Sequence, residues 1–364
     1  MDTAKRQPIY YRTLKPAILL IALATLSQPG AAQHINPFRP INEPPHREKP
    51  DRITPNTFET HKGGETQAIH FASNYRLDRM DTAIHTLLIN IHGLHRDAPG
   101  AFESVIDAVH GAGQNKTTLT ISPQYFNQED LENYRPANKF LYWRNAEWKD
   151  GRASVTDDWR GNKVAMNSYE IMDSLITYVL GSGKFPNIHK VIVAGHSAGG
   201  QFVQRYSAIT PLPDLLPAVR FRFIVMNPSS YMYLDERRPT YNGNFAVPDT
   251  IGCGGYNRYP KGLEQLSDYA LAIGADRIHT NMLTRDIVIL LGGDDTDDAD
   301  KDLDVTCAAE LQGSERLSRG LNFFNYLSSF AEYGQKKNCT VVKKIRHSGK
   351  GLLNSDEGKK WLFE

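Results

Sequence analysis

The sequence predicts an α/β protein, in which a mostly parallel sheet carries helices on both faces. Short apolar runs typical of buried strands alternate along the chain with longer segments that have apolar residues at helical spacing. Glycines end several of the helical segments, as they do at helix C-termini. A length of 364 residues and a net charge of +1 fit one large globular domain with an insertion.

The strands and helices are expected in a regular order. The run TAIHTLLINIHG is almost continuously apolar, which is typical of a central strand buried on both faces. Strands are predicted at 65–73, 82–93, 117–123, 189–195, 219–230, 286–293 and 339–347. Helices are predicted at 101–113, 164–183, 197–210, 315–334 and 354–363.

One tract interrupts this alternation. Residues 231–283 are rich in Tyr, Gly and Pro, and they lie between the strands that end near Asn227 and Gly292. In open α/β sheets, ligands bind at the carboxyl edge of the strands. We therefore expect this insertion to form a cap over that edge.

The first 57 residues are expected to precede the folded domain. Basic residues followed by the apolar run 17–26 and the small residues Gly30 and Ala32 predict a signal peptide over residues 1–32, cleaved after Ala32. The run is too short to span a bilayer comfortably, and an uncleaved anchor is the alternative. Residues 33–57 predict a Pro-rich arm, and residues 58–364 the folded domain. The mature protein is expected to be secreted or periplasmic, without stable membrane insertion.

The composition also limits the partners and the redox chemistry. A near-zero net charge without a basic stripe gives no sign of nucleic-acid binding. Three cysteines in an exported protein fit one disulfide and one free thiol. We predict a bond between Cys253 and Cys307, which would tie the insertion to the body of the domain. A Cys307–Cys339 bond is the alternative.

A serine between glycines carries the strongest functional signal. Residues 195–199, GHSAG, match the G-x-S-x-G pattern, follow a predicted strand and open a predicted helix. This is the context of a nucleophile elbow, in which a sharp turn exposes the serine at the end of a strand. The sequence therefore predicts Ser197 as a nucleophile.

A base and an acid are expected after later strands. His347 follows the last predicted strand, from which it could reach over the sheet edge to Ser197. Asp295 follows the strand 286–293 in the run GGDDTDD, with Asp294 and Asp297 as alternative acids. The order Ser, Asp, His differs from the orders in the chymotrypsin and subtilisin folds.

Two backbone N–H groups are predicted to form the oxyanion hole. One is that of Ala198, directly after the nucleophile, and the other is that of Leu94, in the turn after the strand 82–93.

With these motifs, the chain from about residue 83 resembles the α/β-hydrolase superfamily. It is more narrowly similar to a group of secreted microbial α/β hydrolases, through GHSAGGQFVQRY, NPSSYMYL, LGGDDTDD and LQGSERLSRGLNFF. The resemblance implies the α/β-hydrolase fold and a triad of Ser197, Asp295 and His347. It implies no particular substrate.

The predicted activity is hydrolysis of a carboxylic ester through an acyl-enzyme. The substrate is expected to be a small-molecule or polymer-derived ester. No metal or organic cofactor is expected, because the chemistry is complete without one. An exported peptidase or amidase with the same motifs is the main alternative, and a non-catalytic binding protein is a further one. The sequence leaves the oligomeric state open.

Overall fold

The computed structural model describes residues 56–364, except 135, 158–159, 161, 250 and 334–337. The predicted signal peptide and residues 33–55 of the predicted arm lie outside these residues. Strand β1 (Asn56–Lys62) begins two residues before the expected start of the folded domain at residue 58. Asn56 and Thr57 are therefore part of the sheet.

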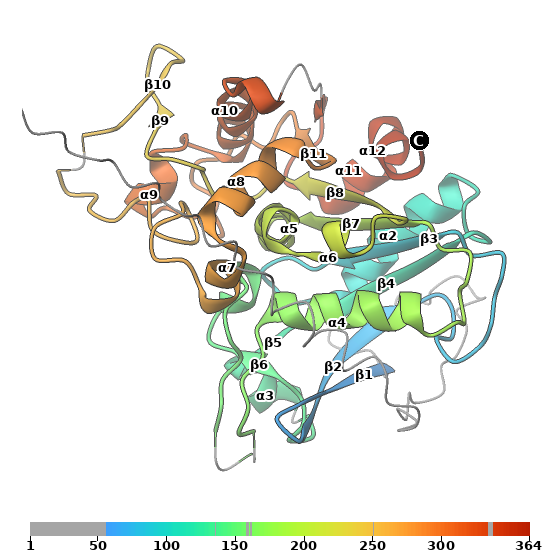
Figure 1. Ribbon diagram of the computed structural model, residues 1–364. Helices are drawn as coiled ribbons and strands as arrows, with labels where there is room; N and C mark the ends of the chain where they lie inside the picture. Colours follow the sequence, from blue (N-terminus) through green and yellow to red (C-terminus); the bar gives the residue numbers. More distant parts are fainter. Residues whose placement is uncertain (1–55, 135, 158–159, 161, 250, 334–337) are drawn as a thin grey trace, which may run out of the picture. The chain divides into compact units, whose positions relative to one another are not determined.

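An eight-stranded sheet forms the centre of the domain (Figure 1). Its strands are, in order across the sheet, β1 (Asn56–Lys62), β2 (Glu65–Ser73), β4 (Thr118–Gln124), β3 (Thr86–Ile91), β7 (Lys190–His196), β8 (Arg220–Met226), β11 (Ile287–Gly292) and β12 (Cys339–Val342). The six strands from β4 to β12 run parallel, whereas β2 is antiparallel to β4 and to β1. The predicted mostly parallel sheet is confirmed.

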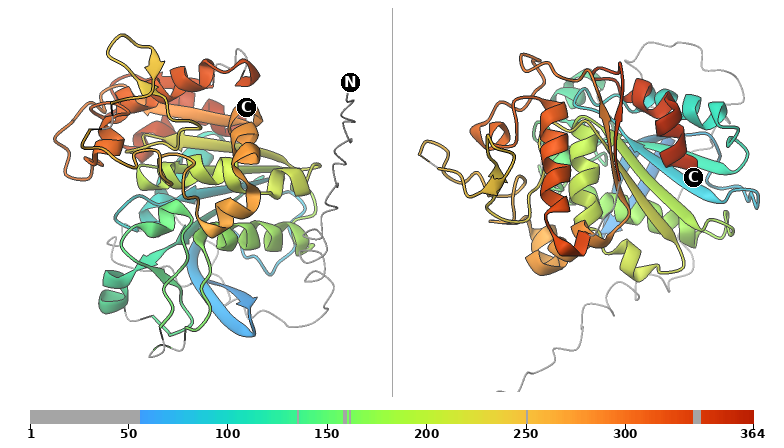
Figure 2. Two further views of the ribbon diagram at one scale, coloured as in Figure 1. Left: turned by 60° about the vertical axis from the view of Figure 1, so that its left-hand side comes forward. Right: turned by 90° about the horizontal axis from the view of Figure 1, so that it is seen from above.

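Helices cover both faces of this sheet. One face carries α4 (Ser168–Gly181), α5 (Ala198–Ile209), α8 (Ala275–Thr284) and α10 (Arg316–Ser328), which contribute to the larger apolar core. The other carries α2 (Ala98–Gly111), α11 (Gly349–Asn354) and α12 (Asp356–Phe363) over a second core. In the right-hand view of Figure 2, orange-red α10 and yellow-green α5 lie on one side of the sheet and the dark red α12 on the other.

Shorter elements occupy the connections. These are β5 (Phe126–Asn127), β6 (Tyr142–Trp143), β9 (Arg238–Pro239), β10 (Phe245–Ala246), α3 (Gln128–Tyr134), α6 (Leu212–Leu215), α7 (Asp268–Ile273), α9 (Cys307–Glu310) and the 3-10 turns η1 (Glu147–Asp150) and η2 (Ala331–Tyr333). Strand β5 pairs with β6, and β9 with β10. Helix α11 was expected as a loop. Ser348 caps it by accepting a hydrogen bond from the N–H of Gly351.

The insertion at 231–283 is only partly a surface feature. Tyr231 and Tyr233 are fully buried, and the Tyr231 ring stacks on Phe323 of α10 with 4.5 Å between centroids. Helix α8 packs against α5 on the same face of the sheet. The start of the expected cap therefore belongs to the core, because its tyrosines fill the space between the sheet and α10.

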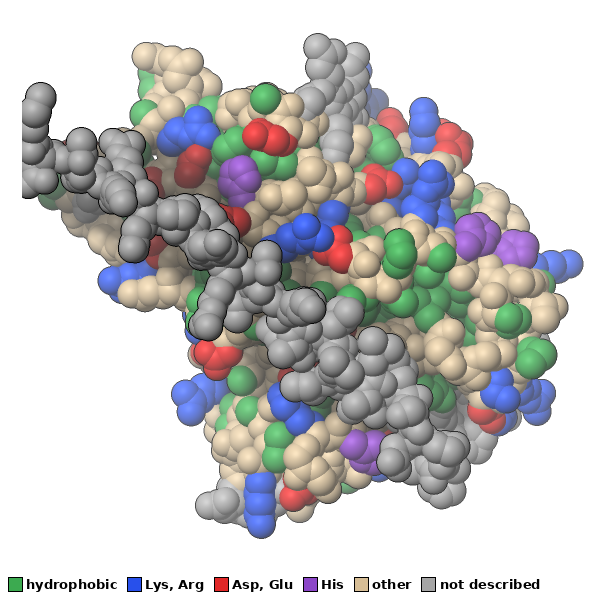
Figure 3. Space-filling model, in the orientation of Figure 1, with side chains coloured by type: hydrophobic (Ala, Val, Ile, Leu, Met, Phe, Trp, Pro, Cys, Tyr) green, Lys and Arg blue, Asp and Glu red, His purple; other side chains and the backbone are tan. Residues whose placement is uncertain are grey.

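The surface is mixed in charge. On the face drawn in Figure 3, cationic and anionic side chains are interspersed rather than gathered into one patch of a single sign. None of the helices in the described part of the chain has the length and apolarity needed to cross a membrane.

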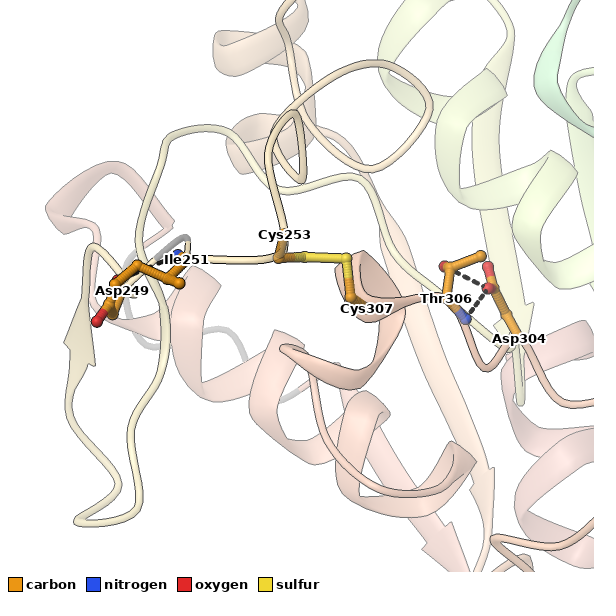
Figure 4. The surroundings of a disulfide bond; sticks show 6 residues. All are labelled: Asp249, Ile251, Cys253, Asp304, Thr306 and Cys307. Atoms are coloured by element: carbon orange, nitrogen blue, oxygen red, sulfur yellow. Dashed lines mark hydrogen bonds between the residues drawn. A yellow bond between two sulfur atoms is a disulfide. The ribbon is translucent and has the colours of Figure 1, made fainter.

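A disulfide joins the insertion to the segment that follows β11. Cys253 bonds to Cys307 at the start of α9, across a separation of 54 residues (Figure 4). Just before it, Thr306 donates a side-chain hydrogen bond of 2.6 Å to Asp304, and the Lys261 ammonium lies 2.9 Å from the same carboxylate. Cys339 is a free thiol. The pairing found is the one that the sequence analysis preferred.

The turn between β7 and α5 is packed too tightly for side chains at its glycines. A Cβ at Gly199 would lie 2.3 Å from the carbonyl oxygen of Ile91, and one at Gly195 would lie 2.4 Å from that of Gly199. A Cβ at Gly200 would lie 2.6 Å from the Met226 carbonyl oxygen. The start of α5 thus rests directly on the backbone at the ends of β3 and β8.

Removing the disulfide should destabilise the protein. For a closed loop of this length, the chain-entropy model gives a stabilisation of about 4 kcal/mol. The double variant Cys253→Ala/Cys307→Ala should unfold at a clearly lower urea concentration than the wild type, whereas Cys339→Ala should change the midpoint much less. Equal midpoints for wild type and double variant would contradict this expectation.

Substituting Gly199 should disturb the β7–α5 turn. A methyl group against the Ile91 carbonyl must displace backbone, so Gly199→Ala should cost roughly 2 kcal/mol or more of unfolding free energy. Gly181→Ala is the matched control, since a Cβ there meets nothing within 4 Å, and it should change stability by at most about 1 kcal/mol. Chemical denaturation of both variants measures the difference, and a neutral Gly199→Ala would refute the packing argument.

Candidate active site

Ser197 lies in a strained turn at the carboxyl end of β7. Its φ of 58° and ψ of −119° are unusual for a residue with a side chain. Its N–H donates to the carbonyl of Met226 at 2.9 Å, which holds the turn against β8. The residue is 8% exposed and lines a cavity of about 270 Å³. This is the geometry that G-x-S-x-G predicts.

His347 and Asp295 are joined by a hydrogen bond. His347 Nδ1 lies 2.7 Å from Asp295 Oδ2, and Asp295 is 2% exposed. The two alternative acids, Asp294 and Asp297, are exposed. Of the three candidate aspartates, Asp295 is the one in contact with the histidine.

Asn227 holds the Asp295 carboxylate from the other side. Its Nδ2 donates to the same Oδ2 atom, while its Oδ1 accepts the N–H of Gly292 at 2.9 Å. Asn227 is fully buried and adopts a φ of 42° directly after β8. The side chain thereby connects the ends of two neighbouring strands, β8 and β11.

The imidazole of His347 lies next to the serine turn. Its ring centroid is 4.3 Å from that of His196, the residue before Ser197. A Cβ on Gly349 would come within 2.8 Å of the His196 Cβ, so the loop after β12 packs closely on this turn. Among the described residues, no hydrogen bond joins the Ser197 hydroxyl to His347.

His196 itself is a poor candidate for a base. Burial, followed by the positive charges of His347 and Arg316, lowers its pKa well below the usual range. Its Nε2 atom is buried without a hydrogen-bond partner among the described residues. His196 is therefore neutral and packs beside His347.

Both predicted oxyanion donors belong to residues that line the cavity. Ala198 is the first residue of α5, where the helix itself offers no carbonyl to its N–H. Leu94 follows Gly93, at which a Cβ would lie 3.9 Å from the Ser197 Cβ. Ala198 and Leu94 thus line the same cavity as Ser197.

His92 fixes the turn that carries Leu94. Its Nε2 accepts the N–H of Tyr125 at 3.0 Å, so Nδ1 carries the proton and donates to the Gly93 carbonyl at 2.9 Å. Burial lowers the pKa of His92 to about 4. A neutral imidazole with a hydrogen bond at each nitrogen therefore holds the backbone next to Ser197.

The wall of the cavity comes from segments outside the predicted cap. The lining residues are Leu94, Ala146, Lys149, Ser197, Ala198, Gln201, Ser229, Lys301, Asp302, Leu303 and Asp304. Among the described residues, none from 231–283 is part of this lining. The insertion instead supports the wall indirectly, through the disulfide and the Lys261–Asp304 ion pair.

Asn227 and the wall segment 301–304 were not among the predicted site residues. Asparagine tolerates positive φ better than most residues, so its place directly after a buried strand could have indicated a sharp turn at the sheet edge. The alternating aspartates after Asp297 gave no indication of which side chains would face the serine. In the described part of the chain, no group of three or more His, Cys, Asp or Glu side chains is arranged to hold a metal ion.

Comparisons with known proteins agree with this architecture. No family model matches the sequence, and no curated protein is significantly similar to it. Poly(aspartic acid) hydrolase-1 from Sphingomonas sp. KT-1 is similar in structure, with a TM-score of 0.56 and 23% identity over 85% of this chain and 98% of that chain.

A second solved structure is similar over most of the domain. It is the poly(3-hydroxybutyrate) depolymerase LpqC from Bordetella parapertussis, with a TM-score of 0.51 and 20% identity over 79% of this chain and 81% of that chain. At these identities the likeness concerns the fold. Together with the sheet order and the helices on both faces, it shows that the chain has the α/β-hydrolase fold.

Proposed function

We propose that the protein is a serine hydrolase that cleaves a carboxylic ester through an acyl-enzyme. The observation that carries the proposal is the hydrogen bond between His347 and the buried Asp295, beside the strained turn of Ser197. A serine, a histidine and an acid from three different strand ends form the arrangement needed for nucleophilic catalysis.

In this mechanism the bond to Asp295 determines which nitrogen of His347 acts. Because Nδ1–H donates to the carboxylate, Nε2 is the atom free to accept the proton of Ser197. The Ser197 oxygen attacks the carbonyl carbon of the ester, and the N–H groups of Ala198 and Leu94 stabilise the oxyanion. His347 then returns the proton to the leaving alcohol. A water activated by the same histidine hydrolyses the acyl-enzyme.

The substrate class is suggested by the cavity and by the similar structures. The two similar structures are named for poly(aspartic acid) and poly(3-hydroxybutyrate). The units of the first polymer are joined by amide bonds, and those of the second by ester bonds. A cavity of about 270 Å³ is large enough for one such unit rather than a long acyl chain. We favour an ester derived from a polymer or a similarly small ester.

An amide substrate is the second candidate. One similar structure is named for poly(aspartic acid), a polymer joined by amide bonds. Lys149 and Lys301 line the cavity together with Asp302 and Asp304, so the lining carries charges of both signs. A panel of matched esters and amides, each with and without a carboxylate, distinguishes the two candidates. Faster hydrolysis of amides than of the matched esters would favour the amidase.

Export is proposed on the sequence of residues 1–32 alone. Mass spectrometry of the N-terminus of the mature protein would test the cleavage expected after Ala32.

Labelling with a fluorophosphonate should identify Ser197 as an activated serine. The wild type should be labelled, and Ser197→Ala and His347→Ala should not, since the first lacks the nucleophile and the second its base. Ser229→Ala, which removes the other serine of the cavity, should still be labelled. A folded wild type that resists labelling would contradict the proposal and favour the binding-protein alternative.

Substitution of the acid should separate Asp295 from its neighbours. Asp295→Asn leaves the histidine without its carboxylate partner and should lower kcat by roughly 10³–10⁴-fold. Asp294→Asn and Asp297→Asn change exposed side chains and should stay within a few-fold of the wild type. Ester hydrolysis at saturating substrate measures the effect, and equal losses in all three variants would contradict the assignment.

A further inference from the structure

A buried arginine lies between the Asp295–His347 pair and the wall of the cavity. Arg316 is the first residue of α10 and is fully buried. Its Nη1 lies 3.8 Å from Asp295 Oδ1 and 3.1 Å from Asp300 Oδ2, and its Nε donates to Ser229 Oγ at 3.3 Å. Its charge is therefore shared between the acid of the triad and the acidic segment beyond it.

The contact of Arg316 with Asp295 is electrostatic rather than directional, because Nη1 lies 3.8 Å from the carboxylate oxygen. Among the described residues, neither of its Nη atoms makes a well-directed hydrogen bond. A bidentate arginine clamp would instead fix a carboxylate through two parallel hydrogen bonds. Arg316 thus acts on Asp295 through its charge, in a site where little water is present to screen it.

We propose that Arg316 is a positioning residue that lowers the affinity of the Asp295–His347 pair for a proton. Asp300 acts in the opposite direction. The inference rests on the proposed function, in which His347 must be unprotonated to act. A fixed positive charge beside Asp295 offsets part of the negative field that the carboxylate exerts on the imidazole. Arg316 therefore keeps the histidine neutral, and reactive, at lower pH.

The other groups around His347 do not supply this charge. Among the described residues, the charged or titratable groups shown to act on the imidazole or on its acid partner are Asp295, His196, Asp300 and Arg316, whereas Arg346, the residue before His347, is exposed to solvent. His196 is neutral, and both aspartates favour protonation of the histidine. Arg316 is the cation among these four groups, so its removal leaves the negative field unopposed.

A neighbouring arginine provides a matched control. Arg319, one turn further along α10, is also fully buried and anchors the same region. Its Nη1 donates to the carbonyl oxygens of Ser229 and Asp304, at 2.5 and 2.8 Å. It forms no ion pair with Asp295 among the described residues, so it supports the wall without acting on the acid.

The experiment measures the titration midpoint of His347 by NMR, together with the pH profile of kcat/KM. Arg316→Met should raise both the midpoint and the acid limb of the profile by about 0.5–1 pH unit, because the pair then takes up a proton more readily. Arg316→Lys keeps the positive charge and should therefore retain most of the wild-type midpoint and acid limb. Asp300→Asn should shift both in the opposite direction, since it leaves the Arg316 charge without its second partner.

The control variant at Arg319 is expected to differ from Arg316→Met in its pH profile. Arg319→Met should raise KM without moving the acid limb. A folded Arg316→Met with a wild-type midpoint would overturn the proposal; if this variant does not fold, an Asp300→Asn variant without a downward shift would do so. The NMR midpoint needs no turnover, so an absence of ester hydrolysis would count against the proposed function and leave this test intact.

Discussion

The site depends on a steric constraint at the β7–α5 turn. Three backbone segments, from the ends of β3, β7 and β8, approach so closely there that Gly195, Gly199 and Gly200 cannot carry a side chain. This contact brings the N-terminus of α5 against the carboxyl edge of the sheet. It also imposes the positive φ of Ser197, which directs the residue to the cavity rather than into the core.

Further contacts connect the ends of the strands that follow Ser197 in the chain. Asn227 bonds to both Asp295 and Gly292, so the ends of β8 and β11 are fixed relative to each other. The N–H of Leu317 in turn donates to the Asp295 carbonyl at 3.2 Å, which places the start of α10 beside the acid. The buried charge of Arg316 is located by this backbone contact. The same few hydrogen bonds thus set the position of Asp295 and of the Arg316 charge beside it.

Most of the sheet and the motif residues could be predicted from the sequence, because each depends on local pattern. The strand at Glu65–Ser73 was predicted to the residue, and the glycine pattern of GHSAG specifies its turn almost alone. Asp295 was preferred over Asp294 and Asp297 on the resemblance to the α/β hydrolases, and the structure gives that residue the contact with His347. Residues that act through long-range contacts were not predictable in this way. Nothing near Arg316 in the chain indicates its proximity to Asp295, 21 positions earlier, and the apolar tyrosines of 231–233 gave no sign that α10 would cover them.

The wall of the cavity has well-defined anchor points. The segment between Asp295 and Cys307 begins at a residue held by Asn227 and ends at a disulfide to the insertion, while its middle faces Ser197. Sequence and length can vary between such fixed ends with little effect on the sheet, because loop closure depends only weakly on loop length. Changes at residues 301–304 can therefore reshape the cavity while the sheet and Asp300, the ion-pair partner of Arg316, stay in place.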